Sequence, residues 1–233
     1  MKFRWEVKPF LLASVAAGIV VYGLSRLLGI SNVAGLFLGL LIGGTGVGYM
    51  LYFFRDPEMN TPKEPGIVVA AASGKLAKIV GIHEKDYLQQ DTMRISIFLS
   101  LFDVHVNRFP IAGSSTFLGY FPGKRLFTFT EKSSDVNQHN AIVIRGEETT
   151  CLIRQIVGPV CRRVVYWLSH NKTETVKQGD RFGMMKFGSR LDMYFPKGDI
   201  EMVARIGDQV TAGETIIARI VKKGNNNDGT ASE

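Results

Sequence analysis

Cysteine is scarce in this chain, whose 233 residues include only Cys151 and Cys161. Two cysteines cannot supply the several disulfides that stabilise a small secreted scaffold, and both have apolar neighbours. We therefore expect buried thiols in a reducing compartment. Intrinsic disorder is excluded as well, because fifteen phenylalanines and many isoleucines and valines supply enough apolar surface to form a core.

Charge is absent from most of the N-terminal part. Arg26 is the only charged residue between Phe10 and Phe54, and the uncharged run from Val33 to Phe54 is 22 residues long. That length crosses a hydrocarbon core of about 30 Å as one helix, so a fully soluble protein is excluded. The stretch from Phe10 to Leu24 is shorter and is either a second span or a re-entrant segment. A cleaved signal peptide is the less favoured interpretation, because a full-length span follows.

We expect residues 1–55 to form a membrane anchor of two helices arranged as a hairpin. Basic residues flank its outer ends, whereas only Arg26 lies near the turn; the flanking residues are Lys2, Arg4, Lys8, Arg55 and Lys63. The positive-inside rule then places both ends, and the body that follows, on the cytoplasmic side of the cell membrane. The net charge of +7 suits a body held against anionic lipid. Nucleic acid is not an expected partner, since the basic residues are dispersed and no recognition motif is present.

The rest of the chain has no convincing long amphipathic helix, except near Val160 to Leu168. Its short apolar or alternating runs, separated by glycine turns, are typical of a β-rich domain. We place this domain at residues 56–220 and a polar, disordered tail at residues 221–233. The expected strands are Ile67–Ala71, Leu76–Val80, Arg94–Leu101, Thr116–Tyr120, Ala141–Arg145, Cys151–Val157 and Leu191–Phe195. The predicted fold class is mainly β.

Two segments of this domain follow one pattern: an apolar residue, a tight turn made of glycine and an acid, and an outgoing strand. They are Val176–Gly183, with its turn at Gly179, and Val210–Ile220, with its turn at Gly213. Such units resemble those of flattened β-barrels of the biotinyl and lipoyl carrier type. Because a local fold of this kind hosts many functions, it says little about activity. Two unrelated glycine turns are the alternative.

Five further motifs carry the most information about function. They are FFRDP at Phe53–Pro57, SIFLSLFDVHVNRFP at Ser96–Pro110, KSSDVNQ at Lys132–Gln138, QIVGPVCRRVV at Gln155–Val165 and RFGMMKFGSRLDMYFP at Arg181–Pro196. In these motifs, taken in this order, the chain resembles the phosphatidylserine decarboxylase proenzyme family in its short, membrane-anchored form. The DVHVNR and KFGS segments are the most specific of them.

The resemblance implies an enzyme that cuts its own chain between Gly188 and Ser189. The Ser189 hydroxyl attacks the preceding carbonyl, and elimination followed by hydrolysis leaves a covalent pyruvoyl group at position 189. Residues 1–188 would become the β chain and residues 189–233 the α chain. The pyruvoyl ketone would form a Schiff base with the amine of phosphatidylserine, and loss of carbon dioxide would give phosphatidylethanolamine. No metal is implied.

The resemblance and the chemistry of the side chains also indicate roles for other polar residues. His105 matches a histidine of the family motif and is the candidate general acid and base. Arg108, Arg162 and Arg163 are candidates for the lipid phosphate, since a guanidinium group suits phosphate, and Asn107 is a weaker substrate-binding candidate. The arginines have structural roles or attract anionic lipid in the alternative interpretation.

One position departs from the family pattern. The family has a Pro-Ala-Asp-Gly turn whose aspartate assists serine activation, whereas this chain has Ala71-Ala72-Ser73-Gly74. Ser73 cannot act as an aspartate at neutral pH. Either Asp103 or Asp86 comes close in the fold, or His105 acts without such a partner, or maturation is impaired.

Two alternative functions follow from these observations. The first is a degenerate member of the family that keeps the fold and stays a single chain. The second is a membrane-anchored carrier module, because Met184-Met185-Lys186 superficially resembles the turn that presents a biotinylated lysine. The membrane anchor and the DVHVNR segment argue against the carrier.

Overall fold

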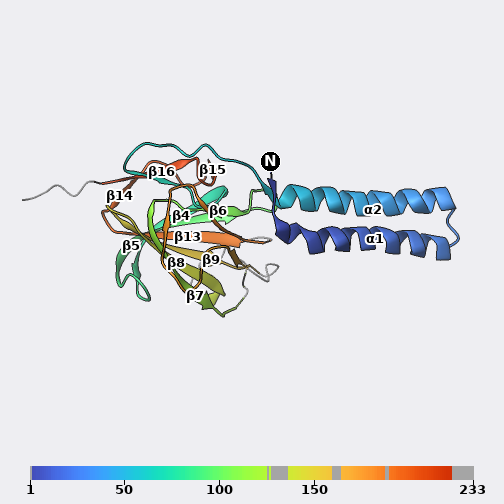
Figure 1. Ribbon diagram of the computed structural model, residues 1–233, viewed down its shortest axis with the longest axis horizontal. Coiled ribbons are helices and arrows are strands. Elements are labelled where there is room, and N and C mark those ends of the chain that lie inside the picture. Colours follow the sequence, from blue (N-terminus) through green and yellow to red (C-terminus); the bar gives the residue numbers. More distant parts are fainter. Residues whose placement is uncertain (1, 125, 127–135, 159–163, 187–188, 222–233) are drawn as a thin grey trace, which may run out of the picture. The chain divides into compact units, whose positions relative to one another are not determined.

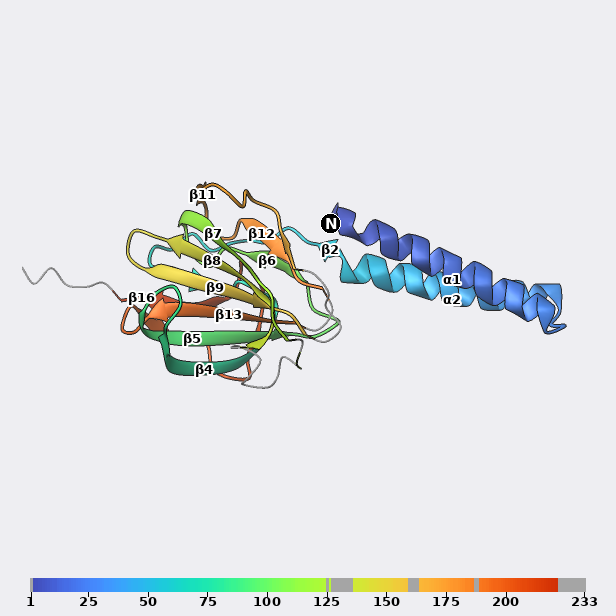
Figure 2. The same cartoon turned by 90° about the horizontal axis from the view of Figure 1, so that it is seen from below.

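The computed structural model describes residues 2–124, 126, 136–158, 164–186 and 189–221. The chain divides into two compact units, Met1–Glu58 and Met59–Glu233. Figures 1 and 2 show the first as a pair of helices and the second as a body made of strands. All elements of the second unit whose bounds the structure gives are strands, as the mainly β fold class predicts.

The first unit consists of two helices and a two-stranded sheet. Helix α1 (Lys8–Leu27) follows a short 3-10 helix, and helix α2 (Asn32–Phe53) is capped by Ser31, whose hydroxyl accepts the Ala34 N–H. Strands β1 (Lys2–Phe3) and β2 (Arg55–Asp56) pair at the other end of the helices. Both helices are long and apolar enough to cross a membrane. The stretch from Phe10 to Leu24 is thus part of one continuous helix.

Glycines allow the two helices to approach closely. A Cβ atom added to Gly18 of α1 would lie 2.7 Å from the carbonyl oxygen of Gly39 in α2, and one added to Gly43 would lie 3.3 Å from the Gly18 Cα. Small residues at such contacts let helix backbones pack in an apolar environment, where burial of apolar surface supplies no driving force. Larger side chains at these three positions would separate α1 from α2.

The strands described in the second unit form three sheets. The strands are β3 (Ile67–Val69), β4 (Gly74–Glu84), β5 (Gln90–Leu99), β6 (Val106–Arg108), β7 (Gly113–Phe121), β8 (His139–Arg145), β9 (Thr150–Ile156), β10 (Val165–Tyr166), β11 (Glu174–Val176), β12 (Arg181–Met184), β13 (Ser189–Pro196), β14 (Ile200–Met202), β15 (Gln209–Val210) and β16 (Ile216–Ile220). Eight strands form one sheet in the order β11-β7-β8-β9-β13-β5-β4-β15. The sheets β10-β12-β6 and β14-β16-β3 have three strands each.

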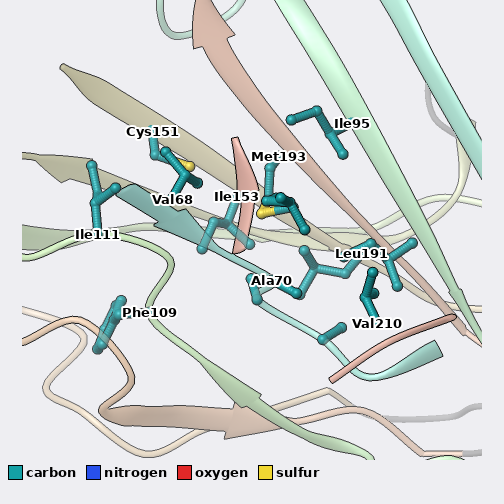
Figure 3. Close-up of a cluster of buried hydrophobic side chains, with 14 of the residues drawn as sticks. Val68, Ala70, Ile95, Phe109, Ile111, Cys151, Ile153, Leu191, Met193 and Val210 are labelled. Carbon is teal, nitrogen blue, oxygen red and sulfur yellow. The ribbon is translucent and has the colours of Figure 1, made fainter. Parts of the chain in front are cut away.

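The hydrophobic core lies against one face of the eight-stranded sheet, which we call the inner face. Alternate residues of its central strands share a single buried cluster with residues of β3, β12 and β16; members of the cluster include Val68, Ile95, Ile97, Leu99, Cys151, Ile153, Phe182, Leu191, Met193 and Ile217. Figure 3 shows part of this cluster. The alternation follows from the two-residue period of a strand. Each expected strand of the sequence analysis overlaps a strand of the structure.

The two turn-and-strand segments lie side by side. Gly179 and Gly213 both have a positive φ, of 82° and 77°, which favours glycine in a tight turn. A Cβ atom added to Gly213 would lie 3.6 Å from the Gly179 Cα. The two copies of the sequence pattern therefore share a positive φ at the turn glycine and pack against each other.

The expected helix near Val160 to Leu168 was wrong for the residues that the structure describes. Val165 and Tyr166 form β10, which pairs with Met184 and Gly183 of β12, and residues 159–163 lie outside the described residues. The expected disordered tail falls on residues 221–233, of which only Val221 is described.

The thiol of Cys151 is buried, as its apolar neighbours predict. Burial raises its pKa well above the usual value, because a thiolate loses its hydration there. Cys151 therefore stays protonated and belongs to the core. Cys161 lies outside the described residues.

Candidate active site

Ser189 is the first residue of β13 and is fully buried. It pairs with Leu99 at the end of β5, and its parity with Leu191 and Met193 places it on the inner face. Among the described residues, the Ser189 hydroxyl has no hydrogen-bond partner. Leaving a buried polar group unsatisfied costs about 1–3 kcal/mol, so this position calls for an explanation.

His105 follows the turn after β5 and is also fully buried. Its Nδ1 lies 2.9 Å from the main-chain carbonyl oxygen of Asp103. A carbonyl oxygen only accepts, so Nδ1 carries the hydrogen and Nε2 keeps the lone pair of the neutral ring. The structure therefore fixes the tautomer in which Nε2 can take up a proton.

The position of His105 along the chain brings it to the segment that precedes Ser189. Its carbonyl oxygen accepts the Met185 N–H at 3.2 Å, and the following residue, Val106, pairs with Met184. The DVHVNR motif is thus joined by hydrogen bonds to Met184 and Met185, which directly precede the KFGS motif about 80 residues further along the sequence. This pairing brings the two principal candidates to one end of the domain.

Asp103 holds the turn that carries His105. Its carboxylate accepts the Ser100 N–H at 2.8 Å, the Ser100 hydroxyl at 2.7 Å and Gln209 Nε2 at 3.0 Å. The contact that links Asp103 to the imidazole is made by its main-chain carbonyl. Asp86, the other acid considered as a substitute, pairs with Arg154 at 2.9 Å, and Arg154 alternates with Ile153, which places it on the outer face of the sheet.

Ser73 lies at the same end of the sheet as Ser189. A Cβ atom added to the next residue, Gly74, would be 3.2 Å from the Cα of Leu99, the register partner of Ser189. Two strand spacings separate β4 from β13, which is roughly 10 Å. The Ser73 hydroxyl is buried and accepts the Ala212 N–H at 3.0 Å. This hydrogen bond ties the loop before β4 to the turn after β15.

We expect Ser73→Ala to destabilise the fold without preventing reaction at Ser189. The Ala212 N–H would lose its acceptor, at a cost of about 1–3 kcal/mol. Urea unfolding of the uncut Ser189→Ala protein, with and without the additional change, measures this loss; cleavage is followed separately in the Ser73→Ala single variant. A folded Ser73→Ala protein that is never cut would show that the Ser73 hydroxyl takes part in the chemistry.

Asn107 is fully buried and lies at one end of a row of side-chain amides. Gln155 Nε2 donates to Asn107 Oδ1 at 2.8 Å, and Asn140 Nδ2 donates to Gln155 Oε1 at 3.2 Å. Gln155 and Asn140 face each other across β9 and β8 on the inner face. Sequence reasoning missed both residues. Their spacing in the sequence could have identified them, because each continues the two-residue alternation of buried apolar residues in its strand.

Arg108 is buried between the two glycine turns. Its Nη1 donates to the Gly179 carbonyl at 2.9 Å, and its Cδ would lie 2.6 Å from a Cβ atom on Gly213. These contacts give Arg108 a part in the packing of the fold. Its role toward a lipid phosphate stays a prediction. The other predicted site residues Gly188, Arg162 and Arg163 lie outside the described residues.

The residues present fit a site that forms its own carbonyl cofactor. The fit rests on the buried, unpartnered hydroxyl of Ser189 and on a histidine whose tautomer leaves Nε2 as a base. Among the residues that the structure describes, no three His, Cys, Asp or Glu side chains come together as a metal-binding group. A buried serine, a buried histidine and a row of buried amides define the candidate active site of an enzyme.

Comparisons with known proteins identify the family. The family model for phosphatidylserine decarboxylase matches residues 48–218. A phosphatidylserine decarboxylase proenzyme of Syntrophus aciditrophicus is 36% identical over 200 residues, which cover 84% of this chain and 91% of the relative. The Chlorobium chlorochromatii proenzyme is 43% identical over 171 residues, covering 73% and 79%. The Azorhizobium caulinodans proenzyme is 37% identical over 216 residues, covering 91% and 87%. No solved structure gives a significant match.

The chain belongs to the phosphatidylserine decarboxylase family. The relatives of the chain reported above are described as proenzymes of this decarboxylase. The resemblance inferred from the motifs is thereby confirmed.

Proposed function

We propose that this protein decarboxylates phosphatidylserine to phosphatidylethanolamine and carbon dioxide, using a pyruvoyl group made from its own Ser189. The observation that carries the proposal is the buried Ser189 hydroxyl without a partner among the described residues, on the inner face of β13 and at the same end of the domain as His105. Membership of the family and the proenzyme descriptions of the relatives support it.

The first step of maturation is attack of Ser189 Oγ on the carbonyl carbon of Gly188. His105 Nε2 takes the hydroxyl proton, the new C–O bond forms, and the C–N bond between the two residues breaks as its nitrogen receives a proton. The product is an ester between the two parts of the chain. Because His105 holds its Nδ1 hydrogen on the Asp103 carbonyl, its Nε2 carries the lone pair that accepts the proton.

Elimination then separates the two chains. A base removes the Cα proton of Ser189, the Cβ–O bond breaks, and the Gly188 carboxylate leaves with the bonding electrons. One water molecule hydrolyses the resulting dehydroalanine and ammonia is released, which leaves a pyruvoyl group at position 189. Residues 1–188 form the β chain and residues 189–233 the α chain.

In the mature enzyme the pyruvoyl carbonyl supplies an electron sink for the decarboxylation of a serine headgroup. His105 supplies a proton to the substrate carbon that has lost carbon dioxide, since its Nε2 is the group in the site able to exchange one. The burial of Ser189, His105 and Asn107 excludes bulk water from the reacting atoms. Arg108, Arg162 and Arg163 are the proposed ligands of the lipid phosphate.

The helices α1 and α2 form the proposed membrane anchor, a hairpin of two spans with the β-rich domain on the cytoplasmic side. Their length and composition and the basic residues that flank them support this topology. The paired turns at Gly179 and Gly213 support a domain built from biotinyl- or lipoyl-like units.

The proposed function is tested with the purified full-length protein in vesicles that contain phosphatidylserine. We expect phosphatidylethanolamine to form and carbon dioxide to be released in equal amounts. Pretreatment with phenylhydrazine, which reacts with ketones, should abolish both, and pretreatment with a chelator should change neither. Phosphatidylethanolamine formation that resists phenylhydrazine would contradict the pyruvoyl mechanism.

The degenerate, non-maturing family member is the second candidate, and the absence of an acid at position 73 is the observation that favours it. Such a protein would stay a single chain in its native membrane. The carrier module has less support, because Met184 and Met185 are fully buried and Lys186 is partly buried, whereas a carrier lysine must reach a separate enzyme. A streptavidin blot of the protein should be blank.

A further inference from the structure

The row of buried amides ends in a donor without an acceptor. Asn107 Nδ2 is buried and has no hydrogen-bond partner among the described residues, although Asn107 Oδ1 accepts from Gln155 at 2.8 Å. A buried amide N–H that is left unsatisfied costs about 1–3 kcal/mol. An acceptor that is present only during the reaction would explain why the fold keeps such a group.

The neighbouring amides determine which end of the Asn107 side chain is free. Asn140 Nδ2 donates to Gln155 Oε1, so the Gln155 side chain turns its Nε2 toward Asn107. A donor at this point selects the oxygen of Asn107 as its partner. The NH2 group of Asn107 is therefore left for the site, and Gln155 and Asn140 together set its orientation.

The register of the sheet places this row beside Ser189. Gln155 pairs with Leu191, and Ser189 lies two residues along β13 on the same face. Diagonal neighbours of this kind are about 7 to 8 Å apart. Asn107 lies in β6, and His105 directly precedes that strand.

We propose that Asn107 Nδ2 donates a hydrogen bond to the oxygen that becomes negatively charged when Ser189 attacks the preceding carbonyl, and that Gln155 and Asn140 are the residues that position it. The proposal rests on the proposed self-cleavage and adds the group that stabilises its transition state. A donor fixed in a site without bulk water needs no reorganisation as charge develops. Loss of one such donor typically slows a reaction by about 100- to 1,000-fold.

The experiment measures the half-time of self-cleavage of newly made full-length protein by intact mass. Asn107→Asp keeps an oxygen for Gln155 and removes the donor, so we expect cleavage to slow by about 100- to 1,000-fold. Gln155→Glu offers two oxygens in place of the amide, so Asn107 must turn its NH2 group toward position 155 and away from the site. This variant should also slow cleavage strongly, and Asn140→Ala, which frees Gln155, should slow it less.

A matched control is Gln178→Glu. The Gln178 side chain is partly buried, and its Nε2 donates to the carbonyls of Ile67 and Pro110 at 2.8 and 2.9 Å. The change should lower stability and leave the cleavage half-time unchanged. Unfolding of each variant is measured in the uncut Ser189→Ala background, so that loss of fold is separated from loss of rate.

Two results would overturn the inference while the proposed function stands. One is a folded Asn107→Asp protein that cleaves at the wild-type rate. The other is wild-type cleavage in folded Gln155→Glu, which would show that Asn107 presents its oxygen to the site. Failure of the wild-type chain to cleave would instead contradict the proposed function itself.

Discussion

Replacing Ser189 with alanine is expected to leave an uncut chain of 233 residues with no decarboxylase activity. Alanine has no nucleophile, so neither the ester nor the pyruvoyl group can form at this position. The change removes one buried hydroxyl oxygen that has no partner among the described residues, so the fold should be preserved. Intact mass and a phosphatidylethanolamine assay measure the two effects.

Ser96→Ala is the matched control for this variant. Ser96 is also fully buried and its hydroxyl has no partner among the described residues, but it lies between Ile95 and Ile97 and therefore faces the outer side of β5. We expect normal cleavage and activity. A Ser189→Ala protein that is cut, or that forms phosphatidylethanolamine, would refute the assignment of Ser189.

Replacing His105 with glutamine should slow both self-cleavage and decarboxylation. Glutamine is neutral and cannot take up the Ser189 proton, and general base catalysis typically contributes about 100- to 10,000-fold. The cleavage half-time reports the first effect. The rate of phosphatidylethanolamine formation per cut chain, measured after prolonged incubation, reports the second effect without the first.

His83→Gln serves as the control for His105. His83 is 53% exposed and pairs with Asp91 at 2.9 Å, so its loss should leave both rates unchanged. A His105→Gln protein that cleaves at the wild-type rate would show that His105 takes no part in maturation. If its cut form were also fully active, His105 would have no catalytic role.

Much of the fold could be predicted because its elements are marked by strong local patterns. The long uncharged run from Val33 to Phe54 predicts α2, and alternation at Cys151 to Val157 predicts β9. The segment from Val160 to Leu168 misled because its hydrophobic residues fit a helical period, whereas Val165 and Tyr166 pair with β12. The pairing partners in β12 are about 20 residues away in the sequence, so the local hydrophobic pattern does not indicate this pairing.

The candidate site could likewise be predicted only in part from the sequence. Ser189 and His105 belong to motifs and could be picked out from the sequence. Gln155 and Asn140 could not be connected with them, because their link to Asn107 depends on the register of β8, β9 and β13. The tautomer of His105 is likewise set by a main-chain carbonyl, a contact that no residue type indicates.

The structure gives Ser73 a role in the fold. The sequence presents it as a missing acid, and the structure gives its hydroxyl a hydrogen bond to the Ala212 N–H. The group that contacts His105 Nδ1 is the Asp103 carbonyl, held in place by the bonds of the Asp103 carboxylate to Ser100 and Gln209. A carbonyl fixes the ring orientation without adding a charge. We therefore expect His105 to act without an aspartate at position 73.

The most direct test of the account is the intact mass of the wild-type protein purified from its membrane. We predict two fragments, residues 1–188 and residues 189–233, the smaller one beginning with a carbonyl-reactive pyruvoyl group and lighter than its sequence by the conversion of serine. A single uncut chain that binds no carbonyl reagent would contradict the central claim and identify the protein as a member of the family that does not mature.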